Sequence, residues 1–130
     1  GLGASAEDYE TYRPLFKKYV PVLTALDAAG WEPVPYALID REGLVMERYG
    51  SAEYGSVYYT LYASDEQSGA VTITIDLASL GFTAKTAKKL TVSDIISENS
   101  VSASLSSDGK TMTVTLELSP AQLAVLEISR

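Results

Sequence analysis

The chain has 130 residues and contains neither cysteine nor histidine, which excludes disulfides, thiolate metal sites and imidazole-based catalysis. Its formal net charge of −7 disfavours nucleic acid as a partner, because an acidic chain repels phosphate. No apolar run approaches the roughly 20 residues of a membrane-spanning helix, so we expect no membrane partner, and a chain of this length suits a single domain with its own core.

The amino-terminal part of the chain carries a helical pattern. Between residues 7 and 29 apolar side chains recur at steps of three and four, which predicts an amphipathic helix. Pro14 suits the first turn of such a helix, whereas Pro21 is expected to kink it or split it in two. Gly30 is placed to end the helix, and the alternating prolines of residues 31–36 predict an extended connection. We therefore interpret residues 1–37 as a helical segment and linker.

From residue 38 onward the apolar period changes from helical to two, as strands require. The stretch from Ser56 to Leu77 shows this best, because apolar and polar residues alternate in both of its halves. The polar residues between the halves end in Gly69, so the stretch is predicted to form a hairpin at the centre of an antiparallel sheet.

Further short strands are predicted along the rest of the chain. They are expected at 45–49, around Leu90 and Val92, at 101–105, at 112–118 and at 123–128. A short helical turn is expected at 78–81, and Asp108-Gly109 marks a tight turn. About six to eight strands at this spacing indicate an antiparallel sandwich or barrel. We expect residues 38–130 to form a β-sandwich on which the amino-terminal helix packs.

Carboxylates are the remaining candidates for catalysis in a chain without histidine. Glu7, Asp8 and Glu10 are expected to start a helix, where negative charge is favoured. A retaining glycosidase needs two carboxyl groups about 5–5.5 Å apart, and no spacing in this chain predicts such a pair. No calcium-binding loop or phosphate-binding glycine motif occurs either. We therefore expect no catalytic residue, no metal site and no cofactor.

Aromatic residues are unusually frequent, with nine tyrosines and one tryptophan. Because sugar rings stack on aromatic faces, we regard Tyr49, Tyr54, Tyr58 and Tyr62 as candidate carbohydrate-binding residues. Tyr58 and Tyr62 share one face of a predicted strand, and Tyr49 and Tyr54 flank a glycine-containing loop. The competing interpretation is that the amino-terminal helix covers the face that bears Tyr58 and Tyr62.

Several stretches together resemble the carboxy-terminal end of bacterial glycoside hydrolases in which a (β/α)8 barrel is followed by an antiparallel β-sandwich. Residues 13–19 and 28–34 resemble the last barrel helix and its exit, 45–50 the entry to the sandwich, and 58–62, 71–77 and 124–128 its strands. No catalytic motif of such enzymes matches, so no catalytic residue is carried over.

The resemblance implies a non-catalytic accessory sandwich of a carbohydrate-active enzyme. Its partner would be the catalytic (β/α)8-barrel domain of the parent protein, absent from this chain, which it would stabilise or orient. Two alternatives stay open: a carbohydrate-binding module that uses exposed Tyr and Trp, and a generic protein-interaction domain marked by an exposed apolar patch. Between possible locations, we expect a secreted or periplasmic one.

Overall fold

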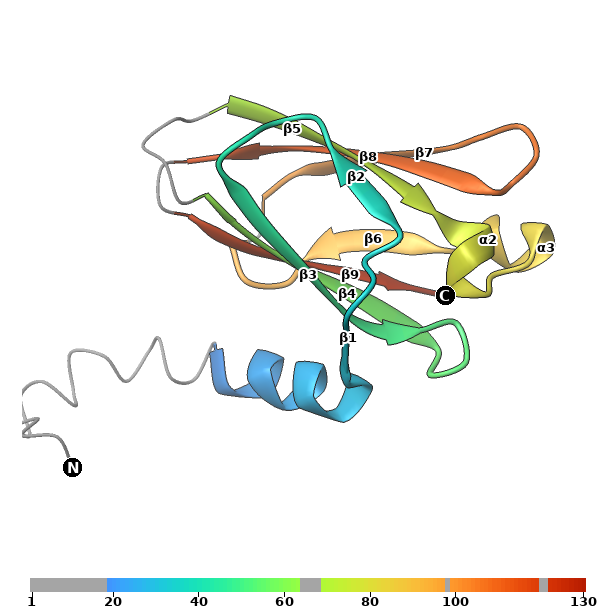
Figure 1. Ribbon diagram of the computed structural model, residues 1–130, viewed down its shortest axis with the longest axis horizontal. Coiled ribbons are helices and arrows are strands. Elements are labelled where there is room, and N and C mark those ends of the chain that lie inside the picture. Colours follow the sequence, from blue (N-terminus) through green and yellow to red (C-terminus); the bar gives the residue numbers. More distant parts are fainter. Residues whose placement is uncertain (1–18, 64–68, 98, 120–121) are drawn as a thin grey trace, which may run out of the picture.

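The computed structural model describes residues 19–63, 69–97, 99–119 and 122–130. Within these residues the chain forms two antiparallel sheets stacked face to face, with a helix at the amino-terminal side (Figure 1). Sheet A has the order β1-β3-β4-β9-β6 and sheet B the order β2-β5-β8-β7. The predicted β-sandwich with an amino-terminal helix packed on it is confirmed.

The described elements follow the alternating patterns of the sequence closely. Sheet A consists of β1 (Trp31–Glu32), β3 (Leu44–Ser51), β4 (Ser56–Ala63), β6 (Thr91–Asp94) and β9 (Leu123–Ser129). Sheet B consists of β2 (Ala37–Ile39), β5 (Gly69–Asp76), β7 (Val101–Leu105) and β8 (Thr111–Leu118). Two single-turn helices, α2 (Leu77–Leu80) and α3 (Ala84–Ala87), lie between β5 and β6.

The core fills the space between the two sheets. From β4 it receives Val57, Tyr59 and Leu61, and from β5 it receives Ile73 and Ile75, all with no exposed area. The partners of β5 on β8 bury their side chains in the same layer. These three strands therefore bury the apolar half of their alternation, which is the main term stabilising the sandwich.

The predicted hairpin across residues 56–77 is wrong as a pairing, although both of its strands exist. Strand β4 pairs with β3 and β9, whereas β5 pairs with β2 and β8. The two strands thus belong to different sheets and face each other across the core. Because both carry a fully buried apolar face, stacking them buries more apolar surface than pairing them edge to edge would.

The amino-terminal helix, helical over residues 19–29, packs on the outer face of sheet A (Figure 1). Val22 and Leu26 are buried there against Tyr58 and Val125. Gly30 ends the helix as predicted, with φ at +89° and its N–H donating to the Leu26 carbonyl. The predicted helix start near Pro14 lies outside the described residues. A kink at Pro21 would change the direction of the chain before Tyr19, and that part of the chain also lies outside them.

The strand expected around Leu90 and Val92 is present as β6, whereas the helix α3 that precedes it was not predicted. The Thr83 side chain accepts a hydrogen bond from the Thr86 N–H and caps α3. A helix of four residues is too short to show a 3.6-residue period, so only its cap could have signalled it. Within the described ranges, no helix has the length and apolar character needed to cross a membrane.

Candidate functional site

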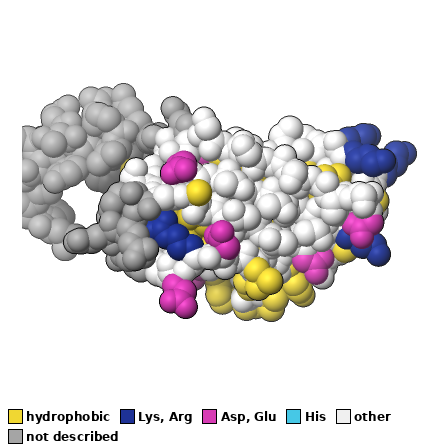
Figure 2. Space-filling model, turned by 90° about the horizontal axis from the view of Figure 1, so that it is seen from above, with side chains coloured by type: hydrophobic (Ala, Val, Ile, Leu, Met, Phe, Trp, Pro, Cys, Tyr) yellow, Lys and Arg dark blue, Asp and Glu magenta, His cyan; other side chains and the backbone are white. Residues whose placement is uncertain are grey.

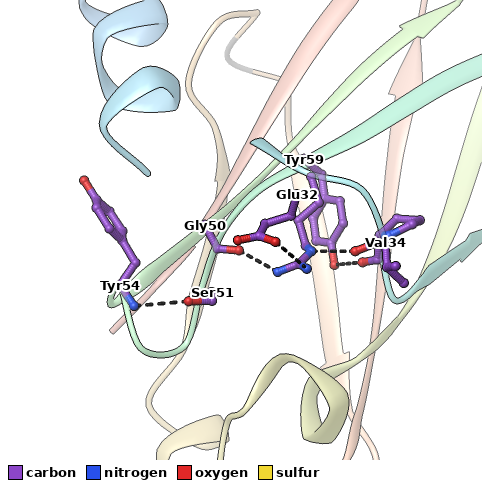
Figure 3. Close-up of polar contacts among 8 residues, drawn as sticks. Glu32, Val34, Gly50, Ser51, Tyr54 and Tyr59 are labelled. Atoms are coloured by element: carbon purple, nitrogen blue, oxygen red, sulfur yellow. Dashed lines mark hydrogen bonds and ion pairs between the residues drawn. The ribbon is translucent and has the colours of Figure 1, made fainter. Parts of the chain in front are cut away.

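A buried arginine fixes the connection between the two sheets (Figure 3). Arg48 of β3 is only 5% exposed. Its Nε donates to the Val34 carbonyl at 2.8 Å, and its Nη1 donates to the Gly50 carbonyl at 2.6 Å. The Glu32 carboxylate lies 3.7 Å from Nη2. The guanidinium is therefore both hydrogen-bonded and charge-compensated, as a buried cation must be.

Tyr59 adds a second bond to the same connection. Its hydroxyl donates to the Pro35 carbonyl at 2.6 Å. Burial raises the pKa of Tyr59 well above its ordinary value, with the Arg48 charge acting in the opposite direction. The hydroxyl thus stays protonated as a donor. Together Arg48 and Tyr59 hold two successive carbonyls of the linker, and we call this arrangement the linker clamp.

The clamped linker turns three apolar side chains outward. Val34, Tyr36 and Leu38, here called the linker stripe, are 47%, 40% and 76% exposed. Tyr36 has a positive φ of 52°, which is uncommon outside glycine, and its ring centre lies 5.3 Å from the Arg48 guanidinium carbon. On the neighbouring strand β5 the outward positions from Thr72 to Asp76 are threonine and aspartate, so the stripe departs from the usual pattern of a solvated face.

The linker stripe borders a groove of about 430 Å³ on the outer side of sheet B. Thr74, Asp76 and Thr111 form its other wall. Figure 2 looks onto this side of the molecule and shows hydrophobic side chains gathered along one edge. Asp76 is already engaged, because its carboxylate accepts hydrogen bonds from the N–H and hydroxyl of Ser79. The groove is therefore an apolar surface and has no free carboxylate pair.

A second group of aromatic side chains lies on the outer face of sheet A. Trp31 of β1 is paired with Tyr49 of β3, which is paired with Tyr58 of β4, which is paired with Glu127 of β9. Directly paired residues of antiparallel strands project from the same face, about 4.5–5.5 Å apart. Three aromatic side chains thus stand next to one another across three strands. We call Trp31, Tyr49 and Tyr58 the aromatic row.

Exposure changes strongly along the aromatic row. Trp31 is 56% exposed, Tyr49 is half-buried, and Tyr58 is 6% exposed because the amino-terminal helix covers it. Burial raises the pKa of Tyr58, and a hydrogen bond with Glu127 acts in the same direction. Burial also raises the pKa of Tyr49, whose hydroxyl donates to the Glu47 carboxylate at 3.5 Å. Hydroxyl and carboxylate groups therefore lie beside the aromatic rings of the row.

The other two candidate tyrosines lie on either side of the aromatic row. Tyr54, in the loop between β3 and β4, is 48% exposed, and after burial and Glu127 it is a further group that raises the pKa of Tyr58. Figure 3 shows its ring directed away from the linker clamp. Tyr62 is 43% exposed but lies four positions along β4 from Tyr58, next to Val45 and Leu123. The structure thus groups Tyr49, Tyr54 and Tyr58 and leaves Tyr62 apart.

Trp31 is the member of the aromatic row that the sequence did not single out as a site residue. It lies in a strand of two residues, so no alternation marked it, and its pairing with Tyr49 depends on contacts between distant segments. The prolines that follow it indicated only an extended path. An exposed tryptophan next to a helix end was the one available signal.

The buried acidic residue Asp94 has a structural role. Asp94 is 5% exposed, and its Oδ1 accepts hydrogen bonds from the N–H groups of Ile96, Ser97 and Val125. It therefore fixes the turn after β6 against β9. In the described ranges, no three Asp or Glu residues are grouped so that they could hold a metal ion. Glu7, Asp8 and Glu10 lie outside those ranges.

Comparison with known proteins gave no relative: no family model, no curated protein and no solved structure matches this chain. The resemblance to glycoside hydrolases therefore rests on the residues quoted for it above.

Proposed function

We propose that this chain is a non-catalytic accessory sandwich of a carbohydrate-active enzyme, and that it orients the catalytic (β/α)8-barrel domain of its parent protein. The observation that supports this most directly is that the apolar surface of the amino-terminal helix is wider than the face that the helix buries. Val22 and Leu26 face sheet A, whereas Val20 and Leu23 are 53% and 60% exposed outside that face. A helix whose apolar surface is wider than its buried face is typical of one that also contacts a second body.

A barrel domain is a suitable body for the outer side of this helix. The outside of a (β/α)8 barrel is a ring of helices, so the helix would pack on it as one helix packs on another. Fully burying a leucine or valine side chain contributes about 1.5–3 kcal/mol. Burial of Val20 and Leu23 against the barrel would therefore stabilise such an interface.

The test uses the parent protein, with the reading frame that precedes this chain. We expect several hundred upstream residues that include two carboxylates in a barrel. The double variant Val20→Ser, Leu23→Ser should lower the unfolding temperature of the barrel in differential scanning calorimetry. The matched control is Val45→Ser, which removes an equally exposed valine, 54% exposed on β3, and should leave the barrel unchanged.

Two results would count against this function. A parent protein with no catalytic domain would remove the partner. A parent whose barrel unfolds at the same temperature in the double variant and in the Val45→Ser control would show that the helix is not the interface.

A generic protein-interaction domain is the second candidate, favoured by the linker stripe. Leu38 is 76% exposed on an edge strand of sheet B, where an outward leucine is unusual in a solvated sheet. In calorimetry of the parent protein, Leu38→Ser would lower the unfolding temperature of whichever domain contacts the stripe, and the double variant of the helix would not.

A further inference from the structure

We infer that the exposed part of the aromatic row, Trp31 and Tyr49, together with Tyr54, binds a neutral oligosaccharide of pyranose sugars. This site goes beyond the proposed function, because it uses the sheet face beside the helix and does not depend on docking of the helix's outer side. It also differs from the four tyrosines that the sequence suggested. It adds Trp31, uses Tyr58 only as a buried support and leaves out Tyr62.

The position of Trp31 carries the first step. Its strand β1 is held to β3 in register, and the Gly50 N–H donates to the Gly30 carbonyl at 2.8 Å directly before it. The backbone is thus fixed, while 56% of the side chain is exposed. An exposed tryptophan whose backbone is already fixed loses no backbone conformational entropy when a flat ligand covers its ring.

The neighbours of Trp31 continue the surface. Tyr49 lies directly beside it in the adjacent strand. Tyr58 lies on the other side of Tyr49, where it is buried under the helix and packs at the inner end of the row. A sugar ring has an apolar C–H face and a polar rim of hydroxyl groups. Aromatic rings can stack on the C–H face of the sugar, and polar groups beside the rings can form hydrogen bonds with its hydroxyl groups.

The polar groups at the row select the class of sugar. Glu47 accepts a hydrogen bond from Tyr49, and Glu127 lies opposite Tyr58 in the register of β4 and β9. Carboxylates are acceptors for sugar hydroxyls but repel sulfate and uronate groups. The chain also carries a net charge of −7. The ligand class is therefore a neutral oligosaccharide and not an acidic one.

The experiment uses the chain as it is and the fluorescence of Trp31, its one tryptophan. The probes are the hexasaccharides of β-1,4-glucan, β-1,4-xylan, β-1,4-mannan and α-1,4-glucan, with oligogalacturonate as the anionic comparison. We expect at least one neutral probe to shift the emission saturably with a dissociation constant in the millimolar range or tighter, and oligogalacturonate to give no shift.

Variants assign the binding to the site. Measured by isothermal titration calorimetry, Tyr54→Ala and Trp31→Ala should each weaken binding about tenfold or more, which corresponds to about 1.4 kcal/mol. The matched control is Tyr62→Ala, which removes an equally exposed tyrosine from the same sheet face outside the row and should leave binding unchanged. Thermal unfolding of each variant verifies that it is folded.

Three outcomes would overturn the inference. The first is the absence of any response to all four neutral probes at millimolar concentration. The second is a loss of binding in Tyr62→Ala as large as that in Trp31→Ala. The third is binding of oligogalacturonate as tight as that of the neutral probes. None of these outcomes bears on the interface proposed for the helix, which is measured in the parent protein.

Discussion

At the scale of single residues, Arg48 shows how a charge becomes part of a core. Its neighbours Leu44 and Met46 at alternate positions of β3 pack against the core, so the period of two places Arg48 on the inward face as well. The sequence thus contained the signal, but a lone arginine in a strand does not show which carbonyls it will meet. Those carbonyls belong to Val34 and Gly50, and only the fold brings Val34 near.

We expect Arg48→Ala to lower the free energy of unfolding by about 2–4 kcal/mol, because it leaves two carbonyl groups without donors. Arg48→Lys should recover only part of this, since one ammonium group cannot reproduce the fork of a guanidinium. Glu32→Gln is the control. Glu32 is 42% exposed and 3.7 Å from Arg48, so its loss should change stability by less than about 1 kcal/mol. Urea unfolding measures all three, and equal effects of Arg48→Ala and Glu32→Gln would contradict the linker clamp.

Gly50 is the second residue whose identity the fold dictates. Its φ is +86°, and an added Cβ would lie 2.3 Å from the Ser56 carbonyl oxygen and 3.3 Å from the Ala29 Cβ. Gly30 has a similar φ of +89° but open space around it. Gly30→Ala should therefore cost about 1 kcal/mol from the backbone alone, and Gly50→Ala about 1–3 kcal/mol more. Chemical denaturation of both variants checks the difference, and similar losses would show that the contact with Ser56 relaxes freely.

At the scale of elements, alternation identified strands more reliably than it identified their partners. The pattern predicted β4, β5, β8 and β9 because each buries every second residue. It could not predict that β4 and β5 lie in different sheets. Either strand buries the same apolar face whether the other one pairs with it in the same sheet or lies across the core in the second sheet. For the same reason Tyr58 and Tyr62 shared a face in the sequence, yet the helix covers Tyr58 and leaves Tyr62 43% exposed.

The helix offers a matched pair of positions for testing which side is docked in this chain. Leu26 is 6% exposed against sheet A and Leu23 is 60% exposed on the other side. Leu26→Asp should lower the free energy of unfolding by about 2–4 kcal/mol, because it buries a carboxylate in an apolar contact. Leu23→Asp should change it by less than about 0.5 kcal/mol. Guanidinium unfolding followed by circular dichroism measures both, and equal losses would mean that the helix does not pack as described.

Acid sensitivity is predicted for the two aspartates that organise α2 and the β7–β8 turn. Hydrogen bonds from Ser79 hold the pKa of Asp76 below its ordinary value, and a hydrogen bond from Ser106 does the same for Asp108. Because the folded pKa is the lower one, these carboxylates stabilise the fold above the ordinary aspartate pKa of about 3.9. This contribution is lost as the pH falls through the lowered values.

The double variant Asp76→Asn, Asp108→Asn should therefore lose less stability than the wild type between neutral pH and strong acid. Melting temperatures recorded along this pH series give the comparison. Parallel curves for the two proteins would show that neither carboxylate is linked to folding.

At the scale of the whole molecule, the structure is a sandwich whose helix and sheets are packed as one body. The sequence predicted the fold class and the packing of the helix, because both follow from the balance of apolar faces. It did not predict the linker clamp or the aromatic row, since each joins residues from segments far apart in the chain, such as Trp31 and Tyr49, and it did not predict the linker stripe because exposure on a short proline-rich segment does not follow from its pattern. These surfaces, and not a set of converging acids, are the features from which we infer function.

The most direct test of this view is amide hydrogen exchange of the isolated chain. The proposed seam, in which the helix lies between the sandwich and the barrel, requires the inner side of the helix to be packed stably on the sandwich. The amides of residues 23–29 should open with free energies close to those of β4 and β9, since Val22 and Leu26 share a cluster with Tyr58 and Val125. If those helix amides instead exchange at the rate of an unfolded peptide while β4 and β9 stay protected, the helix is not part of the same body, and the proposed seam is contradicted.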